Sequence, residues 1–162
     1  KLTVFENVSD PESVESLQNA DVVSLINILE HIAAPDVFLN HMTKLLKDDV
    51  YLVVEVPRHP SLASSCAQLF PDVGYRHIYP PDHMHIFSET SLCNLFELFG
   101  FQMLGKWTFG QDAYQFFASL SLQSGKTDFV NDTVMESLQT MVDNANLSDT
   151  IFAVFCRGMA VE

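Results

Sequence analysis

The sequence predicts an α/β fold with a mostly parallel sheet, from two apolar segments and the helix between them. Residues 21–27 and 50–57 have strand length and flank a segment with helical periodicity. A strand–helix–strand unit of this kind is the crossover of a parallel sheet. Both strands are almost uninterrupted in apolar character, which is typical of strands covered by helices on both faces.

Composition and charge describe a globular chain and limit its partners. The 162 residues are 48% hydrophobic, which suits a single domain over 1–162 with a sizeable core. The chain has 21 acidic and 8 basic residues, for a formal charge of −13. Nucleic acids and anionic membranes are therefore expected to be poor partners. No run reaches the ~20 apolar residues of a membrane span. Three scattered cysteines indicate reduced thiols and a cytoplasmic setting.

The first elements follow from propensity and capping signals. Residues 2–6 are β-prone. Ser9 and Glu12 have the spacing of a capping box, so a helix is expected to end near Asn19. The helix between the two strands opens at Pro35. Its apolar positions recur at helical spacing: Phe38, Met42, Leu45 and Leu46.

Residues 61–70 are expected to form a further helix, and 71–87 a proline-rich loop. The clearest helix comes next, with Ser88 as its N-cap and Gly100 as its stop. One face of this helix is apolar and is expected in the core: Leu92, Leu95, Phe96 and Phe99.

The C-terminal third predicts an antiparallel hairpin and one more helix. Residues 101–109 and 113–122 are aromatic and β-prone, and "GQD" between them suits a turn. The aromatic stretch 116–120 is expected in the core. Residues 150–156 fit either a last strand or a short buried helix. The helix before them has an apolar stripe: Val134, Leu138, Met141, Val142 and Ala145.

Two stretches resemble class I S-adenosylmethionine-dependent methyltransferases. "ADVVSLINILEHIAAPDVFLNHMTKLLKDDVYLVVEVP" resembles the family's fourth strand to its fifth, with an aspartate opening the fourth strand, "LEH" ending it and "LLK" preceding the fifth. "DHMHIFSETSLCNLFELFGF" resembles the loop and helix that follow in small-molecule methyltransferases, including sugar C-methyltransferases. The resemblance implies an incomplete doubly wound, Rossmann-like sheet, S-adenosylmethionine as cofactor, and methyl transfer to a small polar metabolite or sugar.

The family's glycine-rich cofactor loop is missing, since the first glycine of the chain is Gly74. If residues 2–6 correspond to the family's third strand, the chain is the C-terminal part of a methyltransferase fold and is inactive by itself. Strand 21–27 then becomes a sheet edge. We expect such an edge to self-associate or to be covered by residues 1–6.

The first candidate site follows the first long strand. Ligands of open α/β sheets bind at the carboxyl ends of strands, so Glu30 and His31 are expected to face cofactor or substrate. The resemblance implies cofactor binding by Asn27, Leu29 and Glu30 and a catalytic role for His31. The alternative is that His31 only caps the strand–helix junction. A solvated loop is expected for the residues after the second strand: Arg58 and His59.

The second candidate site is the loop "HIYPPDHMH". An imidazole suits proton removal near neutral pH, and a carboxylate beside it can orient the ring. His83 is therefore expected to be the proton acceptor, with Asp82 as its carboxylate. The resemblance places an acidic residue followed by histidine here for that purpose. Tyr79 is expected to orient the substrate, and His85 to pack under the following helix. The alternative is a plain polar turn.

Two other functions stay open. A metal-dependent hydrolase would use ligands in the same loop: His77, Asp82, His83 and His85. Because no paired cysteines or second histidine cluster would close such a site, no metal is expected. Alternatively, the chain is a non-catalytic, methyltransferase-like interaction domain that binds a protein partner and no cofactor.

Overall fold

The computed structural model describes residues 10–70, 76–126 and 131–157. The described elements are, in order, α1 (Pro11–Asn19), β1 (Val22–Ile26), the 3-10 helix η1 (Leu29–His31), α2 (Pro35–Met42), β2 (Tyr51–Pro57), α3 (Leu62–Leu69), α4 (Glu89–Glu97), β3 (Phe101–Phe109), α5 (Asp112–Ser124), α6 (Asp132–Asn144) and β4 (Thr150–Arg157).

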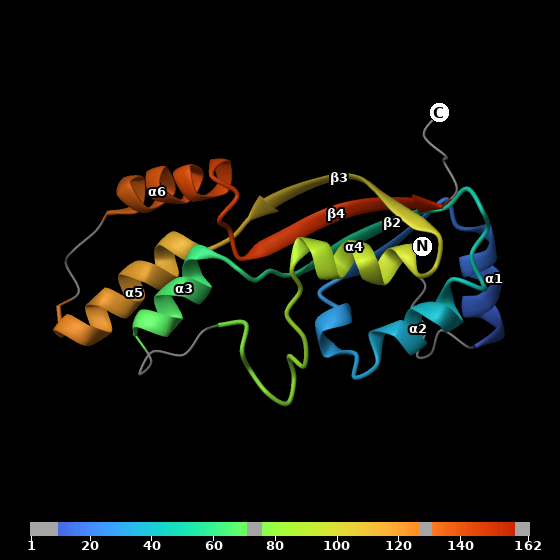
Figure 1. Ribbon diagram of the computed structural model, residues 1–162, viewed down its shortest axis with the longest axis horizontal. Coiled ribbons are helices and arrows are strands. Elements are labelled where there is room, and N and C mark those ends of the chain that lie inside the picture. Colours follow the sequence, from blue (N-terminus) through green and yellow to red (C-terminus); the bar gives the residue numbers. More distant parts are fainter. Residues whose placement is uncertain (1–9, 71–75, 127–130, 158–162) are drawn as a thin grey trace.

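The four described strands form one mixed sheet in the order β1-β2-β4-β3 (Figure 1). β1 pairs with β2 in parallel, and β4 runs antiparallel to both of its neighbours. β1, β2 and β3 therefore point the same way, and only β4 is reversed. The predicted α/β class, with a parallel crossover through α2 and an antiparallel C-terminal part, is confirmed.

The core lies on one face of this sheet. Alternate residues of the inner strands β2 and β4, such as Leu52, Val54 and Phe155, are fully buried there under α2 and α4. Phe96 of α4 stacks on Phe155 with ring centroids 4.2 Å apart. The predicted helix over this face is confirmed: Ser88 caps α4 in a capping box, and Gly100 has a φ of 77°.

The opposite face of the sheet is much less covered. Val22 on β1, Tyr51 on β2 and Trp107 on β3 are 56%, 43% and 53% exposed. Trp107 stacks on Phe152 with centroids 3.9 Å apart. The expectation that strand 21–27 is buried on both faces is therefore wrong, since only Leu25 of β1 is buried. Among the described residues β1 is an edge strand; the β-prone segment 2–6 lies outside them.

The predicted strand over 113–122 is wrong, because these residues belong to helix α5. β3 instead pairs with β4, and the paired residues range from Phe109 with Thr150 to Phe101 with Arg157, so this antiparallel pair is no short hairpin. Residues 150–156, which the sequence left undecided, thus form an inner strand. α5 ends at Gly125, whose φ of 66° suits a left-handed helix stop.

α5 packs against both α3 and α6, away from the main core (Figure 1). Phe116 and Phe117 are only half-buried and lie outside the core cluster. On α6 only Val142 is fully buried, while Val134 and Met141 are 48% and 67% exposed. The apolar stripe of α6 is therefore mostly exposed, and the aromatic stretch 116–120 is partly buried outside the core cluster.

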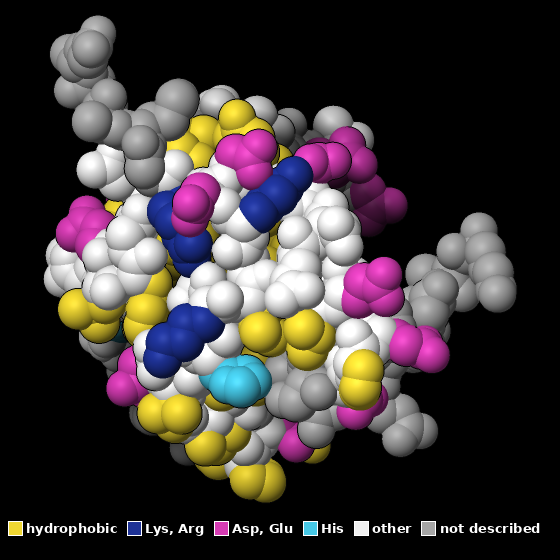
Figure 2. Space-filling model, turned by 90° about the vertical axis from the view of Figure 1, so that its right-hand side faces the viewer, with side chains coloured by type: hydrophobic (Ala, Val, Ile, Leu, Met, Phe, Trp, Pro, Cys, Tyr) yellow, Lys and Arg dark blue, Asp and Glu magenta, His cyan; other side chains and the backbone are white. Residues whose placement is uncertain are grey.

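Basic side chains at the end of the sheet near α1 and α2 are engaged with acids. Lys47 pairs with Asp21 and Asp49, and Arg157 with Asp48. On the face shown in Figure 2, the few basic side chains lie next to acidic ones, and the right-hand part of the view shows acidic and apolar side chains. Along the described stretches of the chain, none of the helices combines the length and apolarity needed to cross a bilayer.

Candidate active site

The chain turns sharply at the carboxyl end of β1. Asn27 adopts a φ of 51°, a left-handed conformation that asparagine tolerates better than most residues. Its N–H donates to the Glu55 carbonyl of β2. η1 then turns Leu29 and Glu30 inward and leaves His31 at the surface. Leu29 is fully buried in the core, so its side chain does not face a ligand site.

The loop before α4 crosses this end of the sheet. The N–H groups of Met84 and His85 donate to the Glu30 carbonyl at 2.8 and 3.2 Å. Further along, Phe87 forms a bridge with Arg58 at the end of β2. The loop therefore runs over the ends of β1 and β2 and brings His83 beside the residues of η1.

Three side chains converge there: Glu30, His31 and His83, which we call the Glu–His–His cluster. One ligand atom from each lies within 4.8 Å of the others. His31 Nε2 is 3.8 Å from Glu30 Oε1. The rings of His31 and His83 meet edge to face, with centroids 4.7 Å apart at 80°.

Backbone carbonyls determine which nitrogen of each ring in the cluster carries the proton. His31 Nδ1 donates to the Asp82 carbonyl at 2.7 Å, and His83 Nδ1 to the His77 carbonyl at 3.2 Å. Since a carbonyl oxygen only accepts, each Nδ1 must be the protonated nitrogen. In the neutral rings, each Nε2 then carries a free lone pair.

Glu30 is the buried member of the cluster. Its side chain is 1% exposed, and neither carboxylate oxygen has a hydrogen-bond partner among the described residues. Burial raises the pKa of Glu30 above its ordinary value, while its own backbone N–H and the nearby His31 and His83 oppose that rise. A carboxylate in such a place is costly unless a proton or a cation compensates it.

Other predicted site residues lie outside the cluster. Asp82 contributes only its backbone carbonyl; its exposed carboxylate has no hydrogen bond to the described residues and does not orient His83. The expected Asp82–His83 pairing is therefore replaced by the His77 carbonyl. Tyr79 is 65% exposed. Asn27 is exposed, with its amide 3.4 Å from Glu55. His85 Nε2 lies 3.4 Å from the Ala33 carbonyl.

A buried acid network, not anticipated from the sequence, holds the start of the loop. Asp149 is fully buried and accepts two hydrogen bonds from Arg76, at 2.7 and 2.8 Å. His77 Nε2 lies 3.2 Å from the same carboxylate. Burial alone would raise its pKa, but His77 and Arg76 hold the pKa of Asp149 at about 2. This network positions His77, whose carbonyl orients His83.

Glycine is required where this network passes the end of β3. A Cβ on Gly110 would lie 2.1 Å from Asp149 Oδ1 and 2.7 Å from Asp112 Oδ2. Asp112 is itself fully buried and accepts from the N–H groups of Ala63 and Asp149. The hairpin turn predicted at "GQD" is wrong, because Asp112 begins α5. Asp112 and Asp149 each flank an apolar segment, which is the only trace of this network in the sequence. Arg58, expected in a solvated loop, is also buried and donates to the Ser148 carbonyl.

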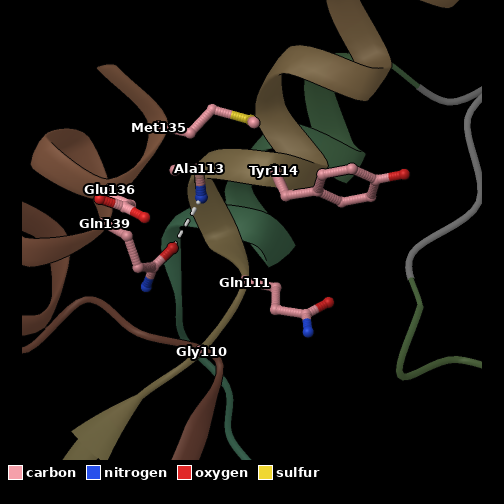
Figure 3. Close-up of a pocket in the computed structure, with 7 residues that line it drawn as sticks. All are labelled: Gly110, Gln111, Ala113, Tyr114, Met135, Glu136 and Gln139. Atoms are coloured by element: carbon pink, nitrogen blue, oxygen red, sulfur yellow. Dashed lines mark hydrogen bonds between the residues drawn. The ribbon is translucent and has the colours of Figure 1, made fainter. Parts of the chain in front are cut away.

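A separate cavity of about 390 Å³ opens between α5 and α6. Figure 3 shows Tyr114 and Met135 on its rim, and Gln139 accepting a hydrogen bond from the Ala113 N–H. No residue of the Glu–His–His cluster lines this cavity. Its lining includes two titratable side chains, Tyr114 and Glu136, but they lie on opposite sides of the cavity and do not converge on a common point.

An open α/β sheet with helices over one face is a Rossmann-like fold, in which ligands bind at the carboxyl ends of the parallel strands. The family follows from sequence comparison: residues 2–105 match the model of the methyltransferase domain. The chain belongs to this methyltransferase-domain family. No curated protein matches it significantly by overall sequence.

Solved structures agree on the fold. A protein assigned as a methyltransferase, from a Haloferax volcanii complex with a methyltransferase activator, shares 15% identity over 90% of this chain and 57% of its own, with a TM-score of 0.52. A small RNA methyltransferase shares 13% identity over 91% of this chain and 15% of its own, with a TM-score of 0.50.

Magnesium protoporphyrin IX methyltransferase from Synechocystis PCC 6803, solved with bound SAH, shares 10% identity over 85% of this chain and 45% of its own, with a TM-score of 0.49. The chain thus spans less than two thirds of the length of each of these three proteins. At such identities the likeness concerns the fold alone.

Proposed function

We propose that this domain takes part in S-adenosylmethionine-dependent methyl transfer to a small polar metabolite or sugar. The observation that carries the proposal is the Glu–His–His cluster at the carboxyl end of β1, in a chain of the methyltransferase-domain family. The net charge of −13 favours a small acceptor over a nucleic acid.

In this proposal, Asn27, Glu30 and the main chain at Leu29 bind the cofactor at the point where β1 ends. His83 is the proton acceptor, since its Nδ1 is bound to the His77 carbonyl and its Nε2 keeps a lone pair. His31 borders the same space. The protein would align acceptor and methyl group and remove one proton, the two contributions that methyl transfer needs.

The second candidate is a non-catalytic interaction domain. The favouring observation is the open face of the sheet, which exposes the apolar side chains Val22, Tyr51 and Trp107. Such a domain would bind a protein partner and leave the Glu–His–His cluster without substrate.

Binding of the cofactor separates these functions. In an amide NMR titration of the chain with millimolar S-adenosylmethionine, with chelator present, we expect saturable shifts at Asn27–His31 and none in α6. NMR is needed because we expect weak binding by the 162 residues alone. A titration without shifts at Asn27–His31 would favour the interaction domain.

A further inference from the structure

We infer that Glu30, His31 and His83 form a binding site for one divalent transition-metal ion of the zinc type. The ligand set is one carboxylate and two imidazoles, a combination that zinc sites use with an open position for water or substrate. It differs from the set suggested by the loop sequence, because Glu30 and His31 come from η1, some fifty residues earlier.

The first argument is an excess of acceptors. The Glu30 carboxylate is buried without a hydrogen-bond partner among the described residues, and His31 Nε2, which carries a lone pair in the neutral ring, lies 3.8 Å from it. His83 completes the group within 4.8 Å. Three converging acceptors are unfavourable unless something positive lies between them, and a cation satisfies all three at once.

The second argument is that both rings are already oriented as metal ligands. A ligating histidine commonly donates its second nitrogen to a carbonyl or carboxylate, which fixes the tautomer and the ring plane. His31 and His83 both do so, through the carbonyls of Asp82 and His77. The His77 carbonyl is in turn held by the Asp149 network.

The distances require only a small closure. Zinc ligands at about 2.1 Å from the metal lie roughly 3.4 Å from one another in a tetrahedral site. The observed 3.8 Å between Glu30 and His31 is close to that value, and the upper limit of 4.8 Å calls for a modest side-chain rotation. His31 is 41% exposed, so the site stays open to solvent on one side.

The other loop residues are less suited to this site. His77 is engaged with Asp149, and the exposed Asp82 carboxylate lies outside the cluster. His85 Nε2 is nearest the Ala33 carbonyl. Asp82 and His85 therefore provide matched controls from the same loop.

A bound cation would change the role of His83 from proton acceptor to ligand. As a Lewis acid it would bind an acceptor hydroxyl and lower its pKa, so that the oxygen loses its proton to water before it attacks the methyl group. Only this use of the cation rests on the proposed function; the site itself does not.

The test is a metal titration of the untagged, chelator-stripped chain, with Zn²⁺ followed by calorimetry and Co²⁺ by visible absorption. We expect one ion per chain. Glu30→Gln, His31→Gln and His83→Gln should each lower the affinity by at least about 100-fold, since loss of an outer partner alone costs 10–100-fold. Asp82→Asn, His85→Gln and the remote His41→Gln should leave the affinity within about threefold of the unaltered chain.

Circular dichroism of each variant shows that it is folded, and Zn²⁺ should raise the Tm of the unaltered chain but not of Glu30→Gln. Absence of binding at millimolar metal, or unchanged binding by Glu30→Gln, would overturn the inference. So would loss of binding in His85→Gln. The titration contains neither cofactor nor acceptor, and the cofactor titration contains chelator, so either proposal can fail without the other.

Discussion

The properties of the Glu–His–His cluster depend on the surroundings of each residue: Glu30 is buried, and neighbouring carbonyls orient His31 and His83. "LEH" and "DHMH" are short polar stretches whose sequence does not reveal that one carboxylate is buried and two rings face it. The orienting groups are backbone carbonyls of Asp82 and His77, which have no sequence signature. The Asp82 carboxylate, which was expected to orient the His83 ring, lies outside the cluster.

Replacing His83 tests its role in the reaction. In the active protein that carries this domain, His83→Asn should lower kcat by 10²–10⁴-fold with cofactor affinity nearly unchanged, as for loss of a general base. The exposed His59→Asn is the control. A variant with the unaltered rate would refute the role. Chelator treatment then distinguishes base from ligand, because only a ligand role makes the unaltered enzyme sensitive to it.

Asp149 makes stability depend on pH. Its folded-state pKa of about 2 lies below the ordinary 3.8, so its contribution is present above pH 3.8 and is lost as the pH falls toward 2. At roughly 1.4 kcal/mol per pH unit, this is about 2.5 kcal/mol. Urea unfolding should show Asp149→Asn well below the unaltered chain at neutral pH, with the gap narrowing as the pH approaches 2.

The exposed Asp48→Asn serves as the control for that series, because its carboxylate is 98% exposed and should matter little at any pH. A gap between Asp149→Asn and the unaltered chain that stayed constant across the acid range would contradict the Asp149 assignment.

At the scale of elements, the prediction of a helix was correct for α4, whereas the prediction of a strand was wrong for α5. α4 has its cap, its stop and its apolar face within the thirteen residues 88–100, and each signal agrees with the others. α5 has aromatic residues that suit a strand and an N-terminal acid that suits a turn. Its helix is supported by contacts with α3 and α6, including the bond from Ala63 to Asp112 and that from Ala113 to Gln139. Those contacts join distant segments and outweigh local propensity.

Phe96 anchors α4 to the sheet. It is fully buried and stacks on Phe155, so Phe96→Ala should lower the free energy of unfolding by about 3–5 kcal/mol. Leu98→Ala, at a position that is 73% exposed, should change it by less than about 0.5 kcal/mol. Chemical denaturation measures both. A loss below about 1 kcal/mol for Phe96→Ala would mean that this face does not pack as described.

At the scale of the whole molecule, the sheet has one covered face and one largely open face among the described residues. β1 lies at the edge, pairs only with β2 within them, and exposes Val22 and Ile26. A strand with an unpaired backbone and exposed apolar side chains favours association with another chain. Tyr51 and Trp107 extend the apolar area across the same face.

We therefore predict that the chain self-associates through β1. Sedimentation velocity should show a concentration-dependent oligomer that Val22→Lys weakens, because a charge at this edge opposes strand pairing. Val37→Lys on α2, an equally exposed apolar position, should leave the oligomer intact. A chain that stays monomeric at several hundred micromolar would contradict the prediction.

The sequence by itself determined what depends on neighbours along the chain. Apolar runs placed β1 and β2, their spacing required a crossover helix, and Ser88 with Gly100 bounded α4. These signals act over a few residues or through simple periodicity. They were enough for the α/β class and for a polar site at the end of β1.

Only the tertiary structure decided the rest. β4 inserts between β2 and β3, so residues more than ninety positions apart become neighbours, and α5 is released from the sheet to pack on α3 and α6. The loop before α4 crosses the end of β1, so His83 meets Glu30 some fifty residues after it. Burial, pairing and orientation of this kind depend on which distant groups exclude water or supply a carbonyl, and no local pattern encodes that.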